Sequence, residues 1–426
     1  MCSARRLLSL SVDEQLARRL AARAAALGVT LDEVMRRDLL RWLGDWGLRF
    51  VTHIVRPGET LSGLAMHYYG DPSAAQVIAA FNALDDPDLI HADQLLRIPE
   101  VGTLTPLPAG ESPYLFGLHD RGGEHLMGWA GRKGWVVITE ELGADADDWS
   151  SCSYADLAAA GYGVIVRLNH GYGEKGTLPH SERYADFARR CGNFVERSQG
   201  CHIWIIANEP NLAVERPGGP VHGQPITPTL YAQAFRLCRE EILRRPGHAY
   251  DQVLTAAIGP WNVQTAYPGN PSGDWIIYFQ DMLRALNGEL DGIALHTYAR
   301  SPDPAEIVSE LRMDPPFEHR RKMFRTYIDF MEAIPEKLRH LPVYITETDQ
   351  NVPWLNQNNG WVQQAYAEID RWNADVAHQA IRALVLYRWE RHDMWAIRDK
   401  EGVIADFRAA LAHEYRWHER VAITGG

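Results

Sequence analysis

The chain has 426 residues, 46% of them hydrophobic and 23% charged, so it has room for about two to four globular domains, one of which could be a full barrel. The formal net charge of -12 argues against a nucleic acid as the partner of the whole chain. No stretch approaches about 18 continuous apolar residues, and charges interrupt every apolar stretch from Leu7 onward, so we expect neither a membrane span nor a signal peptide. The sequence therefore predicts synthesis in the cytoplasm, with any release by lysis or by a dedicated machine.

Residues 1–48 show the pattern of a strand followed by two helices. Alternating apolar residues at 8–12 predict the strand, and helical spacing predicts one helix over 13–27 and a second that begins after the capping residue Thr30. This order resembles the ribbon-helix-helix module, in which strands from two chains pair, so the resemblance implies a homodimer. The positions that read DNA in that family carry no positive charge here, which favours dimerisation over DNA binding; they are Leu7, Ser9 and Ser11. A helical hairpin packed on the next domain is the alternative.

Residues 50–99 carry a second pattern, in which a Pro-Gly turn leads into a helix and the segment closes on Ile98-Pro99. Along its whole length this segment resembles the LysM module. The resemblance implies a small α+β domain of order β-α-α-β that binds glycans containing N-acetylglucosamine, such as peptidoglycan or chitin. It places the glycan groove between two loops, formed by Gly58, Glu59, Thr60 and Leu61 and by Asp88, Leu89 and Ile90. Asp93 stands where the family usually has glycine, and a spacer without sugar affinity is the alternative.

Residues 100–112 are rich in proline and glycine and are typical of a linker. From 113 to about 420, apolar runs alternate with helical patterns, which predicts βαβ units, the α/β fold class and a (β/α)8 TIM barrel. A doubly wound sheet is disfavoured, because the turn after the first strand has no glycine-rich phosphate fingerprint. The predicted strands are Leu115–His119, Trp135–Thr139, Gly163–Leu168, His202–Ala207, Gln252–Ile258, Gly292–His296, Val343–Thr346 and Ala383–Tyr387, and the predicted helices include Tyr231–Leu243, Trp275–Leu286, Arg320–Ala333 and Trp361–Ala377.

Two of these strands lead into a glutamate. Glu209 follows the apolar run 203–207, and Glu347 follows the run 343–346. Runs without alternation are typical of strands buried on both faces, and (β/α)8 barrels place their chemistry at the C-terminal ends of such strands. Two carboxyls that converge there can serve glycoside hydrolysis, in which one protonates the leaving oxygen and the other attacks the sugar or activates water.

Other strand ends add polar and aromatic residues to this pair. Together they resemble clan A of the glycoside hydrolases over residues 113–420, and the matching residues are Asn208-Glu209 after the fourth strand, His296 and Tyr298 at the sixth, Glu347 at the seventh and Trp389 after the eighth. The resemblance implies a retaining glycosidase, with Glu209 as acid/base, Glu347 as nucleophile and the two carboxyls about 5 Å apart.

The neighbours of the two acids indicate how each is kept in its working state. Burial and the charge of Glu347 favour a proton on Glu209. Arg167 and the Tyr298 hydroxyl are expected to donate to Glu347 and keep it ionised, and Asn208 is expected to donate to the sugar 2-hydroxyl. Further catalytic and substrate-binding candidates are His296, Trp389, Trp261, His119 and Asn169.

Some of these residues also have plainer explanations. Arg167 could instead pair with Asp120 or Glu140, His296 could be a satisfied buried histidine, and the tryptophans could pack the wall. His119, His170 and Asp120 could hold a metal, but they follow no ligand motif, and the five cysteines have no metal-ligand spacing. We therefore expect free thiols and no metal or other cofactor.

The sequence thus predicts a retaining glycoside hydrolase for a β-linked polysaccharide of a cell wall or related material, anchored by a LysM module. One alternative is a peptidoglycan-specific lysin, and another is a glycan-binding scaffold whose barrel is inactive. The sugar and its linkage stay open, because loops set specificity and the longest loop, 212–227, has no readable pattern.

Overall fold

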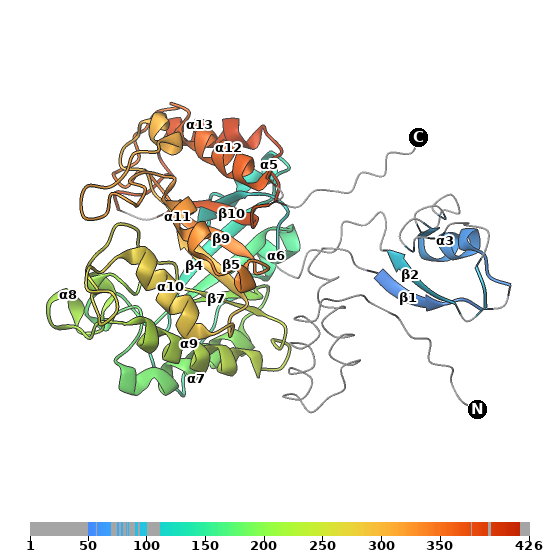
Figure 1. The fold of residues 1–426 in the computed structure, drawn as a ribbon, viewed down its shortest axis with the longest axis horizontal. Coiled ribbons are helices and arrows are strands. Elements are labelled where there is room, and N and C mark those ends of the chain that lie inside the picture. Colours follow the sequence, from blue (N-terminus) through green and yellow to red (C-terminus); the bar gives the residue numbers. More distant parts are fainter. Residues whose placement is uncertain are drawn as a thin grey trace. The chain divides into compact units, whose positions relative to one another are not determined.

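The computed structural model divides the chain into two compact units, Met1–Pro106 with Ala422–Gly426 and Leu107–Val421 (Figure 1). In the first unit it describes residues 50–56, 58–69, 75, 78, 79, 82, 84, 90–92 and 94–99. In the second it describes residues 111–417 except 376, 391 and 392. The strand and helices predicted for residues 1–48, and the homodimer that they imply, lie outside the described residues.

The first unit contains a two-stranded antiparallel sheet and a helix. β1 (Phe50–Ile54) pairs with β2 (Leu95–Pro99), and α3 (Leu61–Tyr69) follows the turn after β1. The Asn82 side chain ties the middle of the segment to β2, because it donates to the Arg97 carbonyl at 2.6 Å and accepts from the Arg97 amide at 2.7 Å. The buried apolar core joins helix and sheet and contains Val55, Leu61, Leu64, Ala65, Ile78, Ala79, Leu96 and Ile98.

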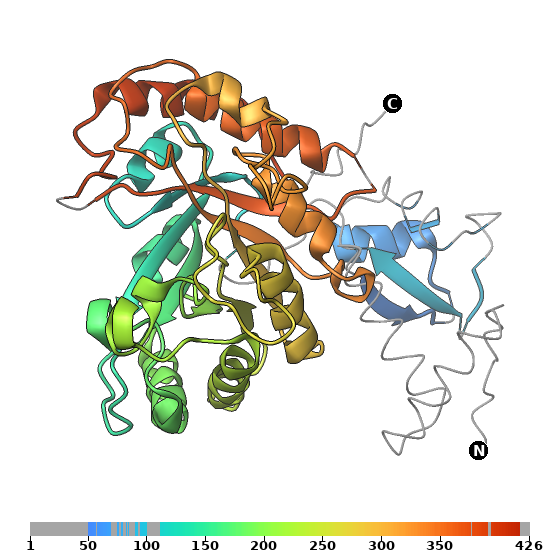
Figure 2. The same ribbon diagram turned by 60° about the vertical axis from the view of Figure 1, so that its left-hand side comes forward.

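The second unit is a closed barrel of eight parallel strands in the order β10-β3-β4-β5-β6-β7-β8-β9, with helices around its outside (Figures 1 and 2). All eight predicted strands are present, so the predicted TIM barrel is confirmed, with strand ends shifted by a few residues. The strands are β3 (Phe116–His119), β4 (Trp135–Glu141), β5 (Gly163–Asn169), β6 (Ile203–Ile206), β7 (Gln252–Thr255), β8 (Gly292–His296), β9 (Val343–Thr348) and β10 (Ile381–Leu386).

Both faces of these strands are buried, which explains why their sequences do not alternate. Val164 and Val166 of β5 pack outward with the helix-facing core, whereas Ile165 belongs to the cluster inside the barrel. That inner cluster also holds Trp135 and Tyr344, whose rings meet edge to face with centroids 5.2 Å apart. The interior is therefore a packed core, and any site must lie at one of its two ends.

The helices follow the predictions closely in three of four cases. α9 (Pro228–Leu243), α10 (Trp275–Leu286) and α12 (Trp361–Asn373) are present, and α10 is capped by Asp274, whose carboxylate accepts from the Ile276 and Ile277 amides. α11 (Thr326–Ala333) begins later than predicted, because Arg321 forms an antiparallel β-bridge with Arg312 and is not helical. The remaining helices are α5 (Glu124–Trp129), α6 (Ala155–Ala160), α7 (Tyr184–Arg197), α8 (Gly219–His222), α13 (Glu401–Leu411) and the 3-10 turns Gly173–Lys175, Ser181–Arg183, Ala213–Glu215, Pro304–Val308 and Glu336–Leu338.

Two further expectations bear on the described residues. No helix among them combines the length and the apolar character needed to cross a bilayer. The four cysteines that the structure describes, Cys152, Cys191, Cys201 and Cys238, are free thiols, as predicted.

Glu111 closes the end of the barrel at which the strands begin. Its fully buried side chain accepts from Gln252 Nε2 at 2.6 Å and from Arg382 Nη1 at 3.0 Å through both carboxylate oxygens. The Arg382 guanidinium in turn lies 4.3 Å from the centroid of the Trp417 ring. A residue from the predicted linker therefore belongs to the barrel and joins the starts of β7 and β10.

We expect Glu111→Ala to lower the free energy of unfolding of the barrel unit by about 3 kcal/mol, because it leaves the Arg382 guanidinium without its carboxylate. Chemical denaturation followed by tryptophan fluorescence measures this change. Glu390→Ala is the matched control, since it removes an exposed ion pair with Arg398 and should change stability by less than about 1 kcal/mol. Equal losses in the two variants would contradict the role given to Glu111.

Candidate active site

A cavity of about 790 Å³ lies at the C-terminal ends of the barrel strands. Most of the site residues predicted from the sequence line it, and His296 and Trp389 do not. The lining residues are His119, Thr139, Arg167, Asn169, Tyr172, Asn208, Glu209, Leu212, Glu215, Pro260, Trp261, Asn262, Tyr298, Arg300, Glu347, Asp349, Asn351, Tyr387, Arg388 and Trp395.

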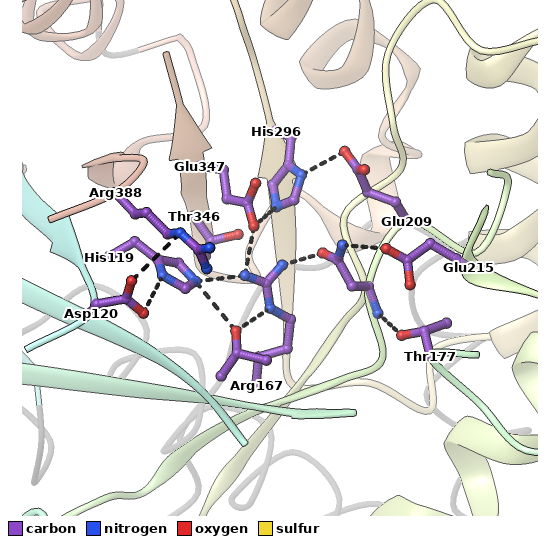
Figure 3. Close-up of polar contacts among 12 residues, drawn as sticks. His119, Asp120, Arg167, Thr177, Glu209, Glu215, His296, Thr346, Glu347 and Arg388 are labelled. Carbon is purple, nitrogen blue, oxygen red and sulfur yellow. Dashed lines mark hydrogen bonds and ion pairs between the residues drawn. The ribbon is translucent and has the colours of Figure 1, made fainter. Parts of the chain in front are cut away.

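Glu347 is the most firmly held acid of the cavity. It lies on β9 and accepts from Arg167 Nη2 at 2.6 Å (Figure 3). It also accepts from the Tyr298 hydroxyl at 2.9 Å. Burial alone would raise the pKa of the Glu347 carboxyl, but its electrostatic interactions with His296 and Arg167 outweigh burial and hold that pKa well below the usual glutamate range. Glu347 is therefore ionised at neutral pH.

Arg167 is fixed by partners from several strands. Its Nε donates to Thr139 Oγ1 at 3.0 Å, its Nη1 donates to Asn208 Oδ1, and its Nη2 donates to His119 Nε2 at 2.6 Å as well as to Glu347. The ion pair of Arg167 is with Glu347. Among the described residues, Arg167 forms no ion pair with Asp120 or Glu140, the alternatives weighed from the sequence. The guanidinium thus faces the anion that the proposed chemistry needs.

His119 supports Arg167 and is itself neutral. Because its Nε2 accepts from Arg167, its proton is on Nδ1, which lies 3.0 Å from Asp120 Oδ1. Burial lowers the pKa of His119, and the charge of Arg167 acts in the same direction. His119 lines the cavity, as expected for a substrate-binding residue, but both of its nitrogens already have protein partners.

Glu209 follows β6 in a strained segment. Its φ is 33° and that of Ala207 is 69°, both in the left-handed region that residues with a Cβ rarely adopt. Asp120, Trp261 and Asn351 share this conformation, and all five lie in segments that follow strands at the cavity end. Backbone strain of this kind persists only where the surrounding structure imposes it, and it is enriched at functional sites.

His296 and Tyr298 connect the two acids. The Glu209 Oε1 atom lies 2.9 Å from His296 Nδ1 and 3.4 Å from the Tyr298 hydroxyl. On the other side, His296 Nε2 lies 3.7 Å from Glu347 Oε1 and has no hydrogen-bond partner although it is buried. Both acids therefore share the same two neighbours, and the sequence predictions placed all four residues at strands that the barrel brings together.

Two further carboxyls at the cavity, the half-buried Glu215 and the buried Asp349, were not found from the sequence. Glu215, in the 3-10 turn Ala213–Glu215, accepts from Asn208 Nδ2 at 3.2 Å, and burial, aided by the charge of Glu209, raises its pKa to about 8. Burial also raises the pKa of Asp349 well above its usual range. Asp349 directly follows the strand of Glu347, which is a usable signal, whereas Glu215 comes from a loop and carries none.

Asn169 is the clearest open binding group of the cavity wall. Its side-chain oxygen and nitrogen are both buried and neither has a hydrogen-bond partner. Asn208, by contrast, is held on both sides, since its backbone amide donates to Thr177 Oγ1 at 2.6 Å and its side chain contacts Arg167 and Glu215. One hydrogen of the Asn208 amide remains for a ligand.

The two tryptophans expected in the wall differ in position. Trp261 lines the cavity, but the Arg300 guanidinium covers one face of its ring at 4.5 Å. Trp389 is only 6% exposed and packs against Gly122 and Gly123, where an added Cβ would lie 2.9 and 2.4 Å from the indole. Trp395, which the sequence analysis missed, lines the cavity where Trp389 does not.

The described residues contain one group of three side chains close enough to hold a metal ion, formed by His202, His248 and Asp251 at the opposite end of the barrel. The two Asp251 oxygens already accept from both histidine Nδ1 atoms at 2.7 Å and from Trp204 Nε1 at 2.6 Å. This hydrogen-bonded arrangement accounts for the group without an ion. His170, considered as a ligand from the sequence, contacts the Lys175 carbonyl through Nδ1 at 2.9 Å.

The predicted glycan groove of residues 50–99 is described in part. Gly58 has a φ of 86°, and the Glu59 carboxylate accepts from the Arg56 amide and contacts His53 Nε2, both at 2.7 Å. The Arg56 hydrogen bond is the main reason why the pKa of Glu59 is lowered. Thr60 caps α3, Leu61 is buried in the core and Ile90 packs against it, whereas Asp88, Leu89 and Asp93 lie outside the described residues.

Comparison with known proteins identifies the smaller unit. Residues 53–99 match the model of the LysM domain, which confirms the predicted module. An uncharacterized protein of Deinococcus radiodurans is 49% identical over 47 residues, 11% of this chain and 19% of that protein. An esterase of Mycobacterium tuberculosis is 33% identical over 96 residues, 22% of this chain and 19% of the esterase. The chain thus spans about a fifth of the length of these relatives.

Among solved structures, the chain is similar to several glycoside hydrolases. A modular endo-beta-1,4-mannanase from Cellulomonas fimi has a TM-score of 0.43 and 15% identity, with 72% of each chain covered. A GH39 enzyme from Xanthomonas axonopodis pv. citri has a TM-score of 0.43 and 14% identity, over 72% of this chain and 68% of that one. A GH128 endo-beta-1,3-glucanase from Amycolatopsis mediterranei has a TM-score of 0.37 and 14% identity, over 70% and 99%. These likenesses are too distant to indicate an activity.

The raised pKa of Glu215 predicts a pH-dependent stability. In the unfolded chain this carboxyl ionises at the ordinary glutamate pKa, whereas the folded protein keeps the proton up to about pH 8. The stability that it contributes is therefore fully present at acidic pH and is lost as the pH rises towards 8. Glu215→Gln does not titrate, so its melting temperature should exceed that of the parent by a margin that grows between about pH 5 and about pH 8.

Thermal unfolding at several pH values measures that margin. Glu289→Gln, at an exposed ion pair with Arg236, is the control and should show no such growth. A margin that stays constant with pH in Glu215→Gln would show that this carboxyl does not hold its proton in the folded protein.

Proposed function

We propose that the barrel unit is a retaining glycoside hydrolase for a β-linked polysaccharide of a cell wall or related material, and that the LysM module binds a glycan containing N-acetylglucosamine. The observation that carries the catalytic half is the Tyr298 hydroxyl, which lies 2.9 Å from Glu347 and 3.4 Å from Glu209. A hydroxyl within reach of both acids places them close together, as a double displacement requires.

The separation of the acids supports retention of configuration. The two carboxylate oxygens that contact the Tyr298 hydroxyl cannot be farther apart than the distances 2.9 and 3.4 Å added together. Two acids that share one hydroxyl lie close together, which favours the carboxyl separation of retaining enzymes, roughly 5 to 5.5 Å, over the roughly 6.5 to 9.5 Å of inverting enzymes. In this proposal the ionised acid is therefore the group that attacks.

In the proposed reaction Glu209 donates its proton to the glycosidic oxygen while Glu347 attacks the anomeric carbon. The bond from that carbon to the leaving oxygen breaks, and the sugar is held as an ester of Glu347. Glu209, now ionised, takes a proton from water, and the resulting hydroxide oxygen attacks the anomeric carbon and displaces the Glu347 carboxylate. The sugar leaves with its original anomeric configuration, and both acids return to their starting states.

The residues around the acids have supporting roles in this proposal. Arg167 and Tyr298 keep Glu347 ionised and orient its carboxylate, because both donate hydrogen bonds to it. His296 orients Glu209 through its Nδ1 atom at 2.9 Å. Asn208 and Asn169 offer hydrogen bonds to sugar hydroxyls, and the Asn208 contact would strengthen in the transition state.

The LysM module supports a setting on an insoluble glycan and does not identify the sugar that the barrel binds. A module of this family beside a glycosidase raises the local concentration of the enzyme on an insoluble glycan. A peptidoglycan-specific lysin is one form of this proposal. The division into residues 1–48, the module at 50–99, the linker 100–112 and the barrel 113–420, with possible pairing of two chains through 1–48, belongs to the proposal as well.

Glu347→Gln should lower turnover about a thousandfold or more, because the amide cannot attack the anomeric carbon. In Glu347→Gly, azide should restore activity and yield a glycosyl azide of inverted configuration, which nuclear magnetic resonance of the product identifies. Arg284→Gln, at a side chain 74% exposed on α10, is the control and should leave turnover unchanged. A product of retained configuration would rule out Glu347 as the nucleophile.

Glu209→Ala should lower hydrolysis of natural glycans about 100- to 10,000-fold, because their leaving groups need a proton. For aryl glycosides with very good leaving groups, the rate of the first step should fall much less, because these leaving groups depart without protonation. Pre-steady-state release of the aryl group measures that step. Equal losses on both kinds of substrate would count against Glu209 as the acid.

Removal of residues 1–106 should reduce retention on insoluble peptidoglycan or chitin without changing kcat/KM on a soluble substrate, because the module acts by tethering. Sedimentation of the enzyme with each polymer, before and after removal, measures retention. Equal retention of the two forms would show that the module is a spacer in this protein.

A further inference from the structure

The three arginines that line the cavity differ in their partners. Arg167 is paired with Glu347, and Arg388 is paired with Asp393. Arg300 makes no ion pair within 4.0 Å with any carboxylate of the part of the chain that the structure describes. Asp314 and Glu306 act on its charge only from beyond that distance, so no carboxylate of the described residues is paired directly with this guanidinium at the cavity.

Arg300 is nevertheless held in a defined place. Its guanidinium carbon lies 4.5 Å from the centroid of the Trp261 ring, and the Trp261 Nε1 atom is anchored on the Arg321 carbonyl at 3.0 Å. The Arg300 backbone amide donates to Glu306 Oε2 at 2.9 Å, so the nearest acid of the same loop is engaged by the backbone and not by the guanidinium.

The hydrogen-bonding capacity of Arg300 is largely unused. Its Nε atom is buried and has no hydrogen-bond partner among the described residues. Its Nη2 atom contacts the sulfur of Met313 at 3.8 Å, and this sulfur is a weak acceptor. Burial also lowers the pKa of Arg300, which shows that the surroundings penalise the charge. A guanidinium that is partly removed from water and left without an acceptor costs stability unless a ligand supplies the acceptor.

We infer that Arg300, held against Trp261 at the cavity wall, binds a carboxylate carried by the sugar chain, so that the substrate is an acidic glycan. This inference rests on the proposed function of the barrel. The planar fork of the guanidinium matches a carboxylate in two parallel hydrogen bonds. A carboxylate with one charge also fits a cavity that Glu209, Glu215, Glu347 and Asp349 line as well, because these acids disfavour a ligand of higher negative charge.

Two sources of that carboxylate share the same chemistry. One is the acid group of a uronic acid, and the other is the free lactyl acid of muramic acid in glycan strands without peptide. Both occur in glycan chains whose carboxyl groups can be reduced chemically to alcohols without cutting the chain. Each acidic ligand therefore has a matched neutral ligand for comparison.

The test measures binding by calorimetry to the full chain carrying Glu209→Gln, in which turnover is suppressed. The ligands are oligosaccharides of each source, with and without reduction of their carboxyl groups. We expect the acidic form from at least one source to bind the parent, and Arg300→Gln to weaken that binding about 10- to 100-fold, as expected for the loss of hydrogen bonds to a charged group. Binding of the reduced form should be weaker and should not depend on Arg300.

Two further variants make the result specific. Arg300→Lys keeps the positive charge but lacks the planar fork of the guanidinium. Its affinity for the acidic ligand should lie between those of the parent and of Arg300→Gln. Arg284→Gln removes an arginine of the barrel surface and should bind all ligands as the parent does. Melting temperatures of all variants separate loss of the contact from loss of the fold.

The inference would be overturned by equal binding of acidic and reduced ligands, by an equal effect of Arg300→Gln on both forms, or by absence of binding for both acidic sources. It is separable from the proposed function by a turnover assay on the unsubstituted chain. Hydrolysis of neutral glycans without any preference for acidic ones would contradict the inference and support the proposed glycosidase activity. Arg300-dependent binding without hydrolysis of any glycan would support the inference and contradict the proposed glycosidase activity.

Discussion

The ion pair between Arg167 and Glu347 is the interaction on which the candidate site depends. Both side chains are almost fully buried, and two charges removed from water are stable only when their remaining donors and acceptors are satisfied. Thr139, His119 and Asn208 accept three of the other hydrogens of Arg167, and the Tyr298 hydroxyl satisfies the second oxygen of Glu347. These partners come from β3, β4 and the segments after β6 and β8. The closed barrel is what brings these strand ends together, so the fold and the site stabilise the same arrangement.

This pair also separates the protonation states of the cavity acids. Glu347 has a buried cation within hydrogen-bonding distance, which keeps it ionised. Glu215 is half-buried and Asp349 is buried, neither has such a partner among the described residues, and the pKa values of both rise. Carboxyls that lie close together can serve opposite roles only when their surroundings differ in this way. The neutral His119 completes the pattern, because a second cation there would compete with Arg167 for the same charge.

The walls of the cavity are more polar than an aromatic sugar platform would be. Trp389 packs against the turn at Gly122 and Gly123, and Arg300 covers one face of the Trp261 ring. Among the described residues, the groups at the cavity with unpartnered hydrogen-bonding atoms include the Asn169 amide and the Arg300 guanidinium. If the cavity binds a glycan, as we propose, recognition would use hydrogen bonds and charge, which discriminate between sugars more sharply than stacking does.

The sequence by itself determined the LysM module, the eight strands and the two glutamates, because each depends on a local pattern: turn residues in fixed order, uninterrupted apolar runs, and an acid directly after a run. It also placed Arg167, Tyr298 and His296 beside those acids, since strand ends of one barrel meet at one rim. Only the tertiary structure decided that Glu111 closes the opposite end, that Trp389 is buried, and that Glu215 and Arg300 line the cavity. Those residues lie in loops or a linker, where side-chain positions follow from packing against distant segments and leave no periodic signal in the chain.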